Sequence, residues 1–208
     1  MTADHERSRT RREFLVVSAA APALAIATVR TLGAQTPRPA PTPACGDGDH
    51  PTPPDTAGPY FKPRSPARTS LLEPDVPGAR IVVEGTVLGA DCRPIPRALL
   101  DFWQADAGGR YDTAGFRLRG HQFTDEAGRY RPETVVPGLY PGRTRHIHAK
   151  VQAPHRAVLT TQLYFPDEPG NRRDFLFTPA LLLAIRDEGA GKRGRFDFVL
   201  DLQTPPAG

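Results

Sequence analysis

The sequence predicts an all-β fold: a single β-sandwich domain of mostly antiparallel strands with long loops. Two observations support this prediction. Apolar and polar residues alternate in several short runs, which is the period of a strand with one buried face. Glycine, proline and aspartate separate the runs, and the 208 residues include 24 prolines and 19 glycines. Many short strands divided by such turns are typical of sandwiches and barrels.

Six segments have the strand pattern, and one segment favours a helix. The expected strands are 81–88, 98–104, 129–135, 145–152, 158–165 and 195–202. The last of them alternates most clearly, with apolar side chains at 196, 198, 200 and 202. A helical turn or two is expected over 179–187, because Pro179 occupies an early position where its missing N–H costs nothing.

The chain is expected to have three parts. Residues 1–34 begin with basic residues that include Arg11 and Arg12, and then run through the apolar stretch Phe14 to Val29. This pattern predicts a twin-arginine signal peptide that is removed near Ala34. Residues 35–54 are dense in proline and glycine and predict an extended, poorly ordered arm. The folded domain is expected over 55–208, a length suited to one core.

The signal predicts where the protein works. An ordinary secretory signal with two arginines is the alternative, but either route leads to the periplasm or the exterior. The apolar stretch is shorter than the roughly 20 residues of a membrane-spanning helix, so no stable membrane anchor is expected after cleavage. The expected partners are the twin-arginine translocase during export and a small-molecule substrate, and a homo-oligomer is left open.

Charge and cysteine content narrow the functional classes. The formal net charge is only +4, so the composition does not call for a nucleic-acid or anionic-membrane partner. Cys45 and Cys92 are the two cysteines, and in an oxidising compartment a pair of this kind is expected to form a disulfide. A zinc site built on these thiols is not favoured, because a structural zinc requires four ligands.

Two histidines are the first candidates for chemistry. His146 and His148 are two positions apart on the expected strand 145–152, so both imidazoles leave the same face. Such a pair on a rigid element can bind a metal ion. It can equally belong to a polar face, and the spacing does not decide between the two readings.

Two tyrosines lie on turn-rich segments nearby in the sequence. The segment 137–143 contains Tyr140 and Arg143, and a glycine-rich loop after the strand 98–104 ends at Tyr111. Turns of this kind would bring these side chains to the mouth of the histidine site. A tyrosine taken alone is more often a half-buried ring with its hydroxyl on a loop.

Four motifs together resemble the intradiol ring-cleavage dioxygenases, especially the protocatechuate dioxygenase subunits. They are WQADAGGRY, RGHQFTDEAGRY, PGLYPGRTRHIHAKV and TTQLYF. The resemblance spans residues 56–166. It combines four residues of metal-ligand type, an arginine three positions before the first histidine, and a glutamine fourteen positions after the second.

The resemblance implies a non-haem Fe(III) centre. In that family Tyr111 and His148 would be the equatorial ligands, and Tyr140 and His146 the axial pair. Hard anionic tyrosinate oxygens favour ferric over ferrous iron. The implied reaction inserts both atoms of O2 into a catechol-type diol and opens the ring between the hydroxylated carbons, which gives a muconate-type diacid. Tyr140 would be displaced when the substrate chelates the metal.

The resemblance also assigns residues around the substrate. Arg143 and Gln162 match residues beside the substrate, and Arg143 suits the stabilisation of negative charge on the ring because its guanidinium stays ionised. The stretch TAGPYF resembles part of the family's pocket and makes Tyr60 a candidate for substrate contact. The loop 166–177 is expected to form part of the pocket wall.

The chain departs from the family in three respects. A proline-rich arm is expected where the catechol dioxygenases that act as homodimers carry an N-terminal helical dimerisation segment. The interval between Tyr140 and His146 is shorter than in protocatechuate dioxygenase, and Arg145 stands where that enzyme has a small apolar residue. The resemblance therefore does not identify which diol is the substrate. Two alternatives are a non-enzymatic, transthyretin-like binding module and a zinc hydrolase. The second is less favoured, because zinc sites use His, Asp, Glu or Cys rather than tyrosine.

Overall fold

A computed structural model of the protein describes residues 50–203, and within them it contains strands and two short 3₁₀ turns. This confirms the all-β prediction. The expected signal peptide, residues 1–34, and most of the expected arm lie outside the described residues. The strands are β1 (Arg80–Gly89), β2 (Leu99–Trp103), β3 (Arg119–Phe123), β4 (Arg129–Tyr130), β5 (Glu133–Val135), β6 (His146–Gln152), β7 (Val158–Tyr164), β8 (Ala184–Glu188), β9 (Gly191–Arg195) and β10 (Phe198–Leu200).

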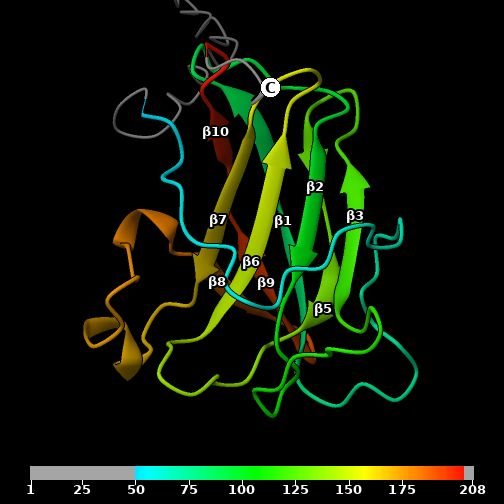
Figure 1. Cartoon of the computed structure of the whole chain (residues 1–208), viewed down its shortest axis with the longest axis vertical. Coiled ribbons are helices and arrows are strands. Elements are labelled where there is room, and N and C mark those ends of the chain that lie inside the picture. The colour runs from blue at the N-terminus through cyan, green and yellow to red at the C-terminus, as the bar shows by residue number, and fades with distance from the viewer. Residues whose placement is uncertain (1–49, 204–208) are drawn as a thin grey trace, which may run out of the picture. The chain divides into compact units, whose positions relative to one another are not determined.

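The strands form two sheets. A four-stranded antiparallel sheet has the order β3-β2-β6-β7. A six-stranded sheet has the order β10-β1-β9-β8, and β4 and β5 also pair with β1. In this second sheet β1 runs parallel to both β9 and β10. Figure 1 shows the four-stranded sheet in front of β1, β9 and β10.

The core lies between the sheets and follows from the alternation of side chains. On β6, the side chains of Ile147, Ala149 and Val151 are buried in the main apolar cluster. They meet the alternate residues of β1, which include Ile81 and Val83. Full burial of one large aliphatic side chain contributes about 1.5–3 kcal/mol. The opposite face of β6 is left for polar side chains.

Three predicted elements were wrong in detail. The expected strand 129–135 is divided into β4 and β5 by Pro132, which has no N–H to donate to a ladder. The expected helix 179–187 is a single 3₁₀ turn, η2 (Pro179–Leu181), followed by strand β8. The expected strand 195–202 is reduced to β10, because Arg195 already belongs to β9.

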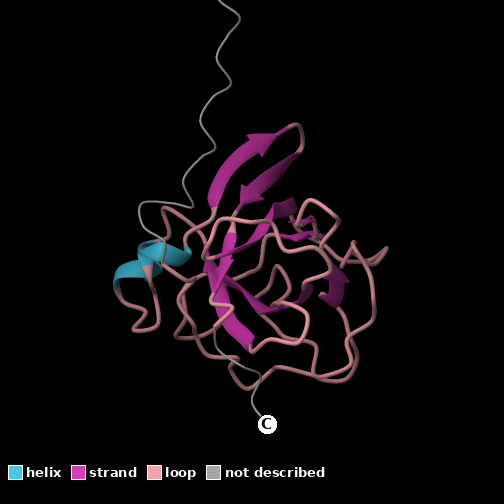
Figure 2. Cartoon of the chain, turned by 90° about the horizontal axis from the view of Figure 1, so that it is seen from above, coloured by secondary structure: helices cyan, strands magenta, loops and turns pink. Residues whose placement is uncertain are grey.

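Two strands were missed, β3 and β9. The sequence of β9, GKRGR, has no apolar alternation. It is a strand because it pairs with β1 in parallel register and with β8 across a hairpin. The second helical turn, η1 (Pro169–Arg172), was also not expected. Figure 2 shows the helical turns together at one side, outside the strands.

The segment before β1 covers the outer face of the four-stranded sheet. The Asp55 amide donates to the Thr160 carbonyl of β7 at 2.8 Å. The Phe61 ring meets Trp103 of β2 edge-on at 4.9 Å, and Ala67 forms a bridge with His121 of β3. The segment, cyan in Figure 1, thus crosses the sheet from β7 to β3. It buries the polar face of β6.

The expected disulfide involves one cysteine within the described residues and one outside them. Cys92 is not a free cysteine, whereas Cys45 lies outside the described residues, so their pairing stays a prediction.

Within residues 50–203, no helix has the length and apolar character needed to cross a membrane.

Candidate metal centre

Strand register brings the predicted residues of β6 and β7 into one row. His148 is the cross-strand partner of Gln162 on one side and of Trp103 on the other. His146 is the partner of Tyr164. Because opposite residues of adjacent strands point to the same face, these side chains gather on the outer face beneath the covering segment. Both histidines are buried there.

Three donor atoms converge at this place. The Tyr111 Oη lies 3.2 Å from the His146 Nε2 and 3.1 Å from the His148 Nε2. The two Nε2 atoms are 3.2 Å apart. Donor atoms that share one metal ion at about 2.0–2.2 Å lie roughly 3 Å from each other. The triangle therefore has the spacing of three ligands of a single ion.

Burial prepares both imidazoles for ligation, and a hydrogen bond also orients His146. The His146 Nδ1 lies 2.6 Å from the Thr144 carbonyl, so it carries the proton and leaves the Nε2 lone pair directed at the triangle. Burial lowers the pKa of His146 to about 4 and also lowers that of His148. His148 stacks on Trp103, with ring centroids 4.8 Å apart and planes 2° from parallel. Both rings are neutral at neutral pH and fixed in orientation.

Tyr111 reaches the triangle from the loop after β2. Asp106 shapes this loop, because its carboxylate accepts hydrogen bonds from the amides of Gly108 and Arg110 at 2.8 and 3.0 Å. Burial raises the pKa of the Tyr111 phenol. A tyrosinate at this position therefore requires a strong positive charge beside it, which a ferric ion would supply.

Tyr140 and Tyr60 lie next to Tyr111 but outside the triangle. Tyr60 stacks on Tyr111 with centroids 4.4 Å apart and planes 10° from parallel. The hydroxyls of Tyr60 and Tyr140 are 3.1 Å apart and share a hydrogen bond. The Tyr140 ring meets Tyr111 edge-on at 5.8 Å. The three tyrosines thus form one cluster above the histidines.

Two glycines hold the tyrosine loops together. Gly109 has φ +81°, and a Cβ at this position would lie 2.1 Å from the Leu139 carbonyl oxygen. A Cβ on Gly138 would lie 2.4 Å from the Gly109 nitrogen. The Gly138 amide donates to the Asp106 carbonyl at 2.7 Å. Only residues without a side chain allow this approach, and it determines the separation of Tyr111 from Tyr140.

A buried arginine joins the loop of Tyr111 to the segment of Tyr60. The side chain of Arg119 is 1% exposed. Its guanidinium donates to the carbonyls of Tyr60 and Asp112 at 2.5 and 2.8 Å. Arg119 thereby fixes the backbone beside both stacked rings.

Arg143 and Gln162 are linked directly. The Arg143 guanidinium donates to the Gln162 Oε1 at 2.7 Å and to the Asp174 Oδ2 at 2.8 Å. The Gln162 amide donates to the Thr56 carbonyl at 2.9 Å. Although burial raises the pKa of Asp174, hydrogen bonds from the Thr144 and Leu176 amides and from Arg143 hold it below its usual value. Asp174 is therefore ionised and orients Arg143.

The donor set fits ferric iron better than zinc. Within residues 50–203, no group of three or more His, Cys, Asp and Glu side chains could hold a metal ion. The converging set is two imidazoles with phenolic oxygens. Hard, anionic oxygen donors favour Fe(III), whereas zinc sites use His, Cys, Asp or Glu.

Asp174→Asn tests the orientation of Arg143. We expect kcat to fall about 10-fold with a smaller change in KM, because an amide holds the guanidinium less firmly than a carboxylate. The amount of bound metal should not change. Glu168→Gln is the matched control, because Glu168 pairs with Arg145 at 2.5 Å instead. Equal losses in both variants would assign Asp174 a purely structural role.

The metal-free protein should lose stability in mild acid. The pKa of His146 is about 4 in the folded chain and about 6.5 when unfolded. The contribution of neutral His146 to the free energy of unfolding is therefore fully present above pH 6.5. It is lost as the pH falls toward 4, and the loss is on the order of 3 kcal/mol. Urea unfolding at several pH values should give a flatter dependence for His146→Gln than for His155→Gln, the control. Parallel curves would contradict the assignment.

The structure brings together every site residue that the sequence predicted. Tyr111, His146 and His148 form the triangle, and Tyr140 contacts Tyr111 through its ring rather than through its hydroxyl. Ligation itself stays a prediction. Sequence reasoning missed Asp55, Trp103, Arg119, Tyr164 and Asp174. The observed strand register places Trp103 opposite His148 and Tyr164 opposite His146, a pairing that was not predicted, and no sequence signal identified the others.

Tyr164 and Asp55 support Gln162 from below. The Tyr164 hydroxyl donates to the Asp55 Oδ2 at 2.7 Å, and the Gln162 amide reaches the Asp55 Oδ1 at 3.2 Å. Burial and the hydrogen bond to Asp55 raise the pKa of Tyr164. Tyr164 therefore stays a neutral phenol.

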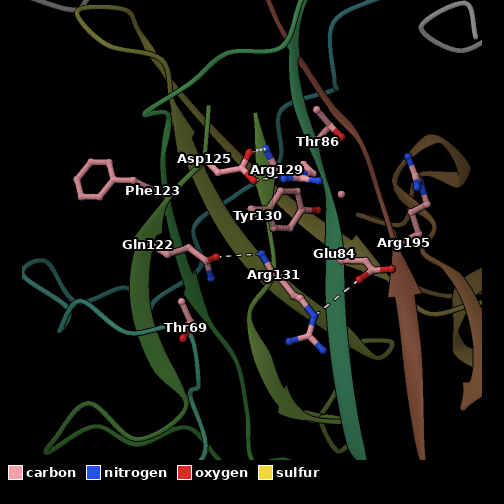
Figure 3. A pocket seen from close by; sticks show the side chains of 11 residues that line it. Thr69, Glu84, Thr86, Gln122, Phe123, Asp125, Arg129, Tyr130, Arg131 and Arg195 are labelled. Atoms are coloured by element: carbon pink, nitrogen blue, oxygen red, sulfur yellow. Dashed lines mark hydrogen bonds and ion pairs between the residues drawn. The ribbon is translucent and has the colours of Figure 1, made fainter. Parts of the chain in front are cut away.

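A separate cavity of about 580 Å³ lies between β1, β3 and β4 (Figure 3). It shares none of its lining residues with the triangle. Its three arginines are already paired: Arg129 with Asp125 at 2.8 Å, Arg131 with Glu84 at 3.9 Å, and Arg195 with Asp197 at 3.0 Å. We therefore place the chemistry at the tyrosine–histidine cluster.

The chain is similar in sequence to known dioxygenases. A family model described as "Dioxygenase" matches residues 56–201. The protocatechuate 3,4-dioxygenase beta chain of Burkholderia cepacia is 37% identical over 152 residues, which cover 59% of this chain and 65% of that one. Catechol 1,2-dioxygenase of Acinetobacter baylyi is 30% identical over 128 residues, which cover 50% and 41%. The chain spans less than two thirds of either relative.

Solved structures of dioxygenases are also similar to this chain. The dioxygenase domain of a dioxygenase carbohydrate-binding protein fusion from Streptomyces sp. SirexAA-E is 60% identical, with a TM-score of 0.72. The match covers 74% of this chain and 99% of that one. The 3-chlorocatechol 1,2-dioxygenase of Rhodococcus opacus is 27% identical, with a TM-score of 0.69, over 75% of this chain and 74% of that one.

Proposed function

The chain belongs to the intradiol ring-cleavage dioxygenases, and on that premise we propose that it is a non-haem iron(III) enzyme that cleaves a catechol-type diol with O2. The product would be a muconate-type diacid that contains both oxygen atoms. The observation that supports this most directly is the triangle of Tyr111, His146 and His148, with Tyr140 and Arg143 beside it.

Tyr111, Tyr140, His146 and His148 would hold the metal. Iron(III) held by these residues would supply a site that the diol can chelate through both oxygens, which makes the ring reactive towards O2. The neutral imidazoles need no proton removed before they bind. Tyr140 would take a proton from the diol, and its phenol would stay in place through the hydrogen bond with Tyr60.

Arg143 would supply positive charge where the ring becomes negative. Its guanidinium remains ionised and is held by Gln162 and Asp174, so little reorganisation is needed during the reaction. Both histidines are buried beneath the covering segment from Asp55 to Phe61, and exclusion of water there would strengthen the electrostatic contribution of Arg143.

Colour and oxygen uptake test this function together. Protein expressed in iron-replete cells should be wine-red, because tyrosinate bound to Fe(III) absorbs visible light. Anaerobic addition of catechol should change the hue, and O2 should then be consumed in a 1:1 ratio with catechol. A folded, colourless and inactive protein would instead support a binding module.

We also propose that the protein is exported. Arg11 and Arg12 before the apolar stretch Phe14 to Val29 support a twin-arginine signal. Replacing both arginines by lysine should retain the precursor in the cytoplasm, as measured by cell fractionation. Unchanged export of this variant would indicate a different route.

A further inference from the structure

A cavity of about 430 Å³ opens on the outer side of Tyr140 and Arg143. One wall is the loop Leu139 to Thr144, and the other is the turn Glu168 to Asp174. The volume lies within the range of about 300–1,000 Å³ that is usual for small-molecule sites. An unsubstituted dihydroxybenzene on the triangle would leave most of this space empty. A substituent on its ring could extend past Tyr140 into the cavity.

The two carboxylates of the cavity wall are neutralised by arginines. Asp174 pairs with Arg143 at 2.8 Å, and their side chains are only 1% and 13% exposed. Glu168 pairs with Arg145 at 2.5 Å. Neither carboxylate therefore has an unmatched charge with which to repel an anion or attract a cation.

Arg173 is the unmatched charge of the cavity. It lines the cavity and is exposed. Within residues 50–203, its guanidinium takes part in no ion pair or hydrogen bond, and only its backbone amide is bonded, to the Gly170 carbonyl at 2.9 Å. The wall thus has one free positive charge at its mouth. A guanidinium in this position is suited to a carboxylate.

The cavity wall also includes an apolar side chain beside Tyr140. Leu139 lines the cavity and is 55% exposed, so its side chain is accessible to a ligand in the cavity. The cavity therefore has an aromatic, an apolar and a cationic lining residue in Tyr140, Leu139 and Arg173.

We propose that the preferred substrates are diols whose ring bears a short apolar side chain ending in a carboxylate, with Arg173 as the residue that selects the acid. This inference rests on the proposed function, because it uses the same site. The side chain lies on Leu139, and the carboxylate meets the Arg173 guanidinium.

A matched pair of substrates tests the selection. The acid is 3-(3,4-dihydroxyphenyl)propanoate, and the neutral analogue is 4-propylcatechol. In the wild-type enzyme kcat/KM should be higher for the acid, and added salt should reduce the advantage. Arg173→Ala should lower kcat/KM for the acid about 3- to 10-fold, mainly through KM, as expected for one partly exposed charge contact. The neutral analogue should be unaffected.

Arg172→Ala is the matched control. Arg172 is the adjacent, exposed arginine, and it does not line the cavity. It should leave both substrates unchanged. Equal losses in the two variants, or no preference for the acid in the wild type, would overturn the inference. Leu139→Ser should reduce kcat/KM for both substituted diols relative to catechol.

Anaerobic calorimetry separates this inference from the proposed function. The dissociation constant of the acid should rise about 3- to 10-fold in Arg173→Ala, whether or not the ring is cleaved. Binding that depends on Arg173 without oxygen uptake would contradict the function but not the cavity. Turnover of the acid with no dependence on Arg173 would contradict the inference about the cavity but not the function.

Discussion

Tyr111→Phe should abolish the visible colour and lower kcat/KM by at least about 100-fold, a loss at the upper end of those seen when ligand support is removed. The substitution removes only the phenolic oxygen that lies 3.1–3.2 Å from both histidine Nε2 atoms. The ring can still stack on Tyr60, so the fold should persist. Iron content, measured by plasma emission, should fall together with oxygen uptake.

Tyr130→Phe is the control for this variant. Tyr130 is a buried tyrosine whose hydroxyl donates to the Phe196 carbonyl at 2.7 Å, away from the triangle. It should lose about 1 kcal/mol of stability and keep its iron, colour and activity. Full iron and activity in Tyr111→Phe would exclude Tyr111 as a ligand.

Gly109→Ala should destabilise the protein by roughly 3 kcal/mol or more and also reduce its iron content. An alanine at φ +81° is strained, and its Cβ would lie 2.1 Å from the Leu139 carbonyl oxygen. The loops can relieve the contact only by moving apart, which separates Tyr111 from Tyr140. Urea unfolding and iron analysis of the same preparation measure both effects.

Gly189→Ala distinguishes strain from contact. Gly189 also has a positive φ, +57°, but a Cβ there meets nothing within 4 Å. It should cost only about 1–2 kcal/mol and leave the iron content unchanged. If the two variants lost the same stability and kept the same iron, the contact between the tyrosine loops would have no role in the site.

The strands that were predicted correctly are those of the two facing core surfaces. In β1, β2, β6 and β7, apolar side chains alternate because one face is buried against the other sheet. The strand β9 has no such face, so its sequence contains no period that could be recognised. Its pairing with β1 exists only after the chain has folded. The same reason accounts for the mistaken helix over 179–187, where local proline preference was overridden by the hairpin of β8 with β9.

Like the strands, the site residues include some that the sequence could predict and others that it could not. The spacing of His146 and His148 placed two imidazoles on one face of a strand, and the structure has them there with Nε2 atoms 3.2 Å apart. Spacing alone did not distinguish Tyr111 or Tyr140 from other tyrosines, and the family motifs were needed. Asp174 and Arg119 had no signal at all, because each acts on residues distant in the sequence through backbone turns and buried contacts.

The sequence by itself determined the all-β class, the face on which the histidines lie and, through its motifs, the family. These follow from local period and from residue identity, which do not depend on distant contacts. Tertiary structure decided how the tyrosine loops approach each other, what holds Arg143, and which charge stays free beside the site. Each of these depends on segments far apart in the chain, and the distance between such segments is settled only by packing.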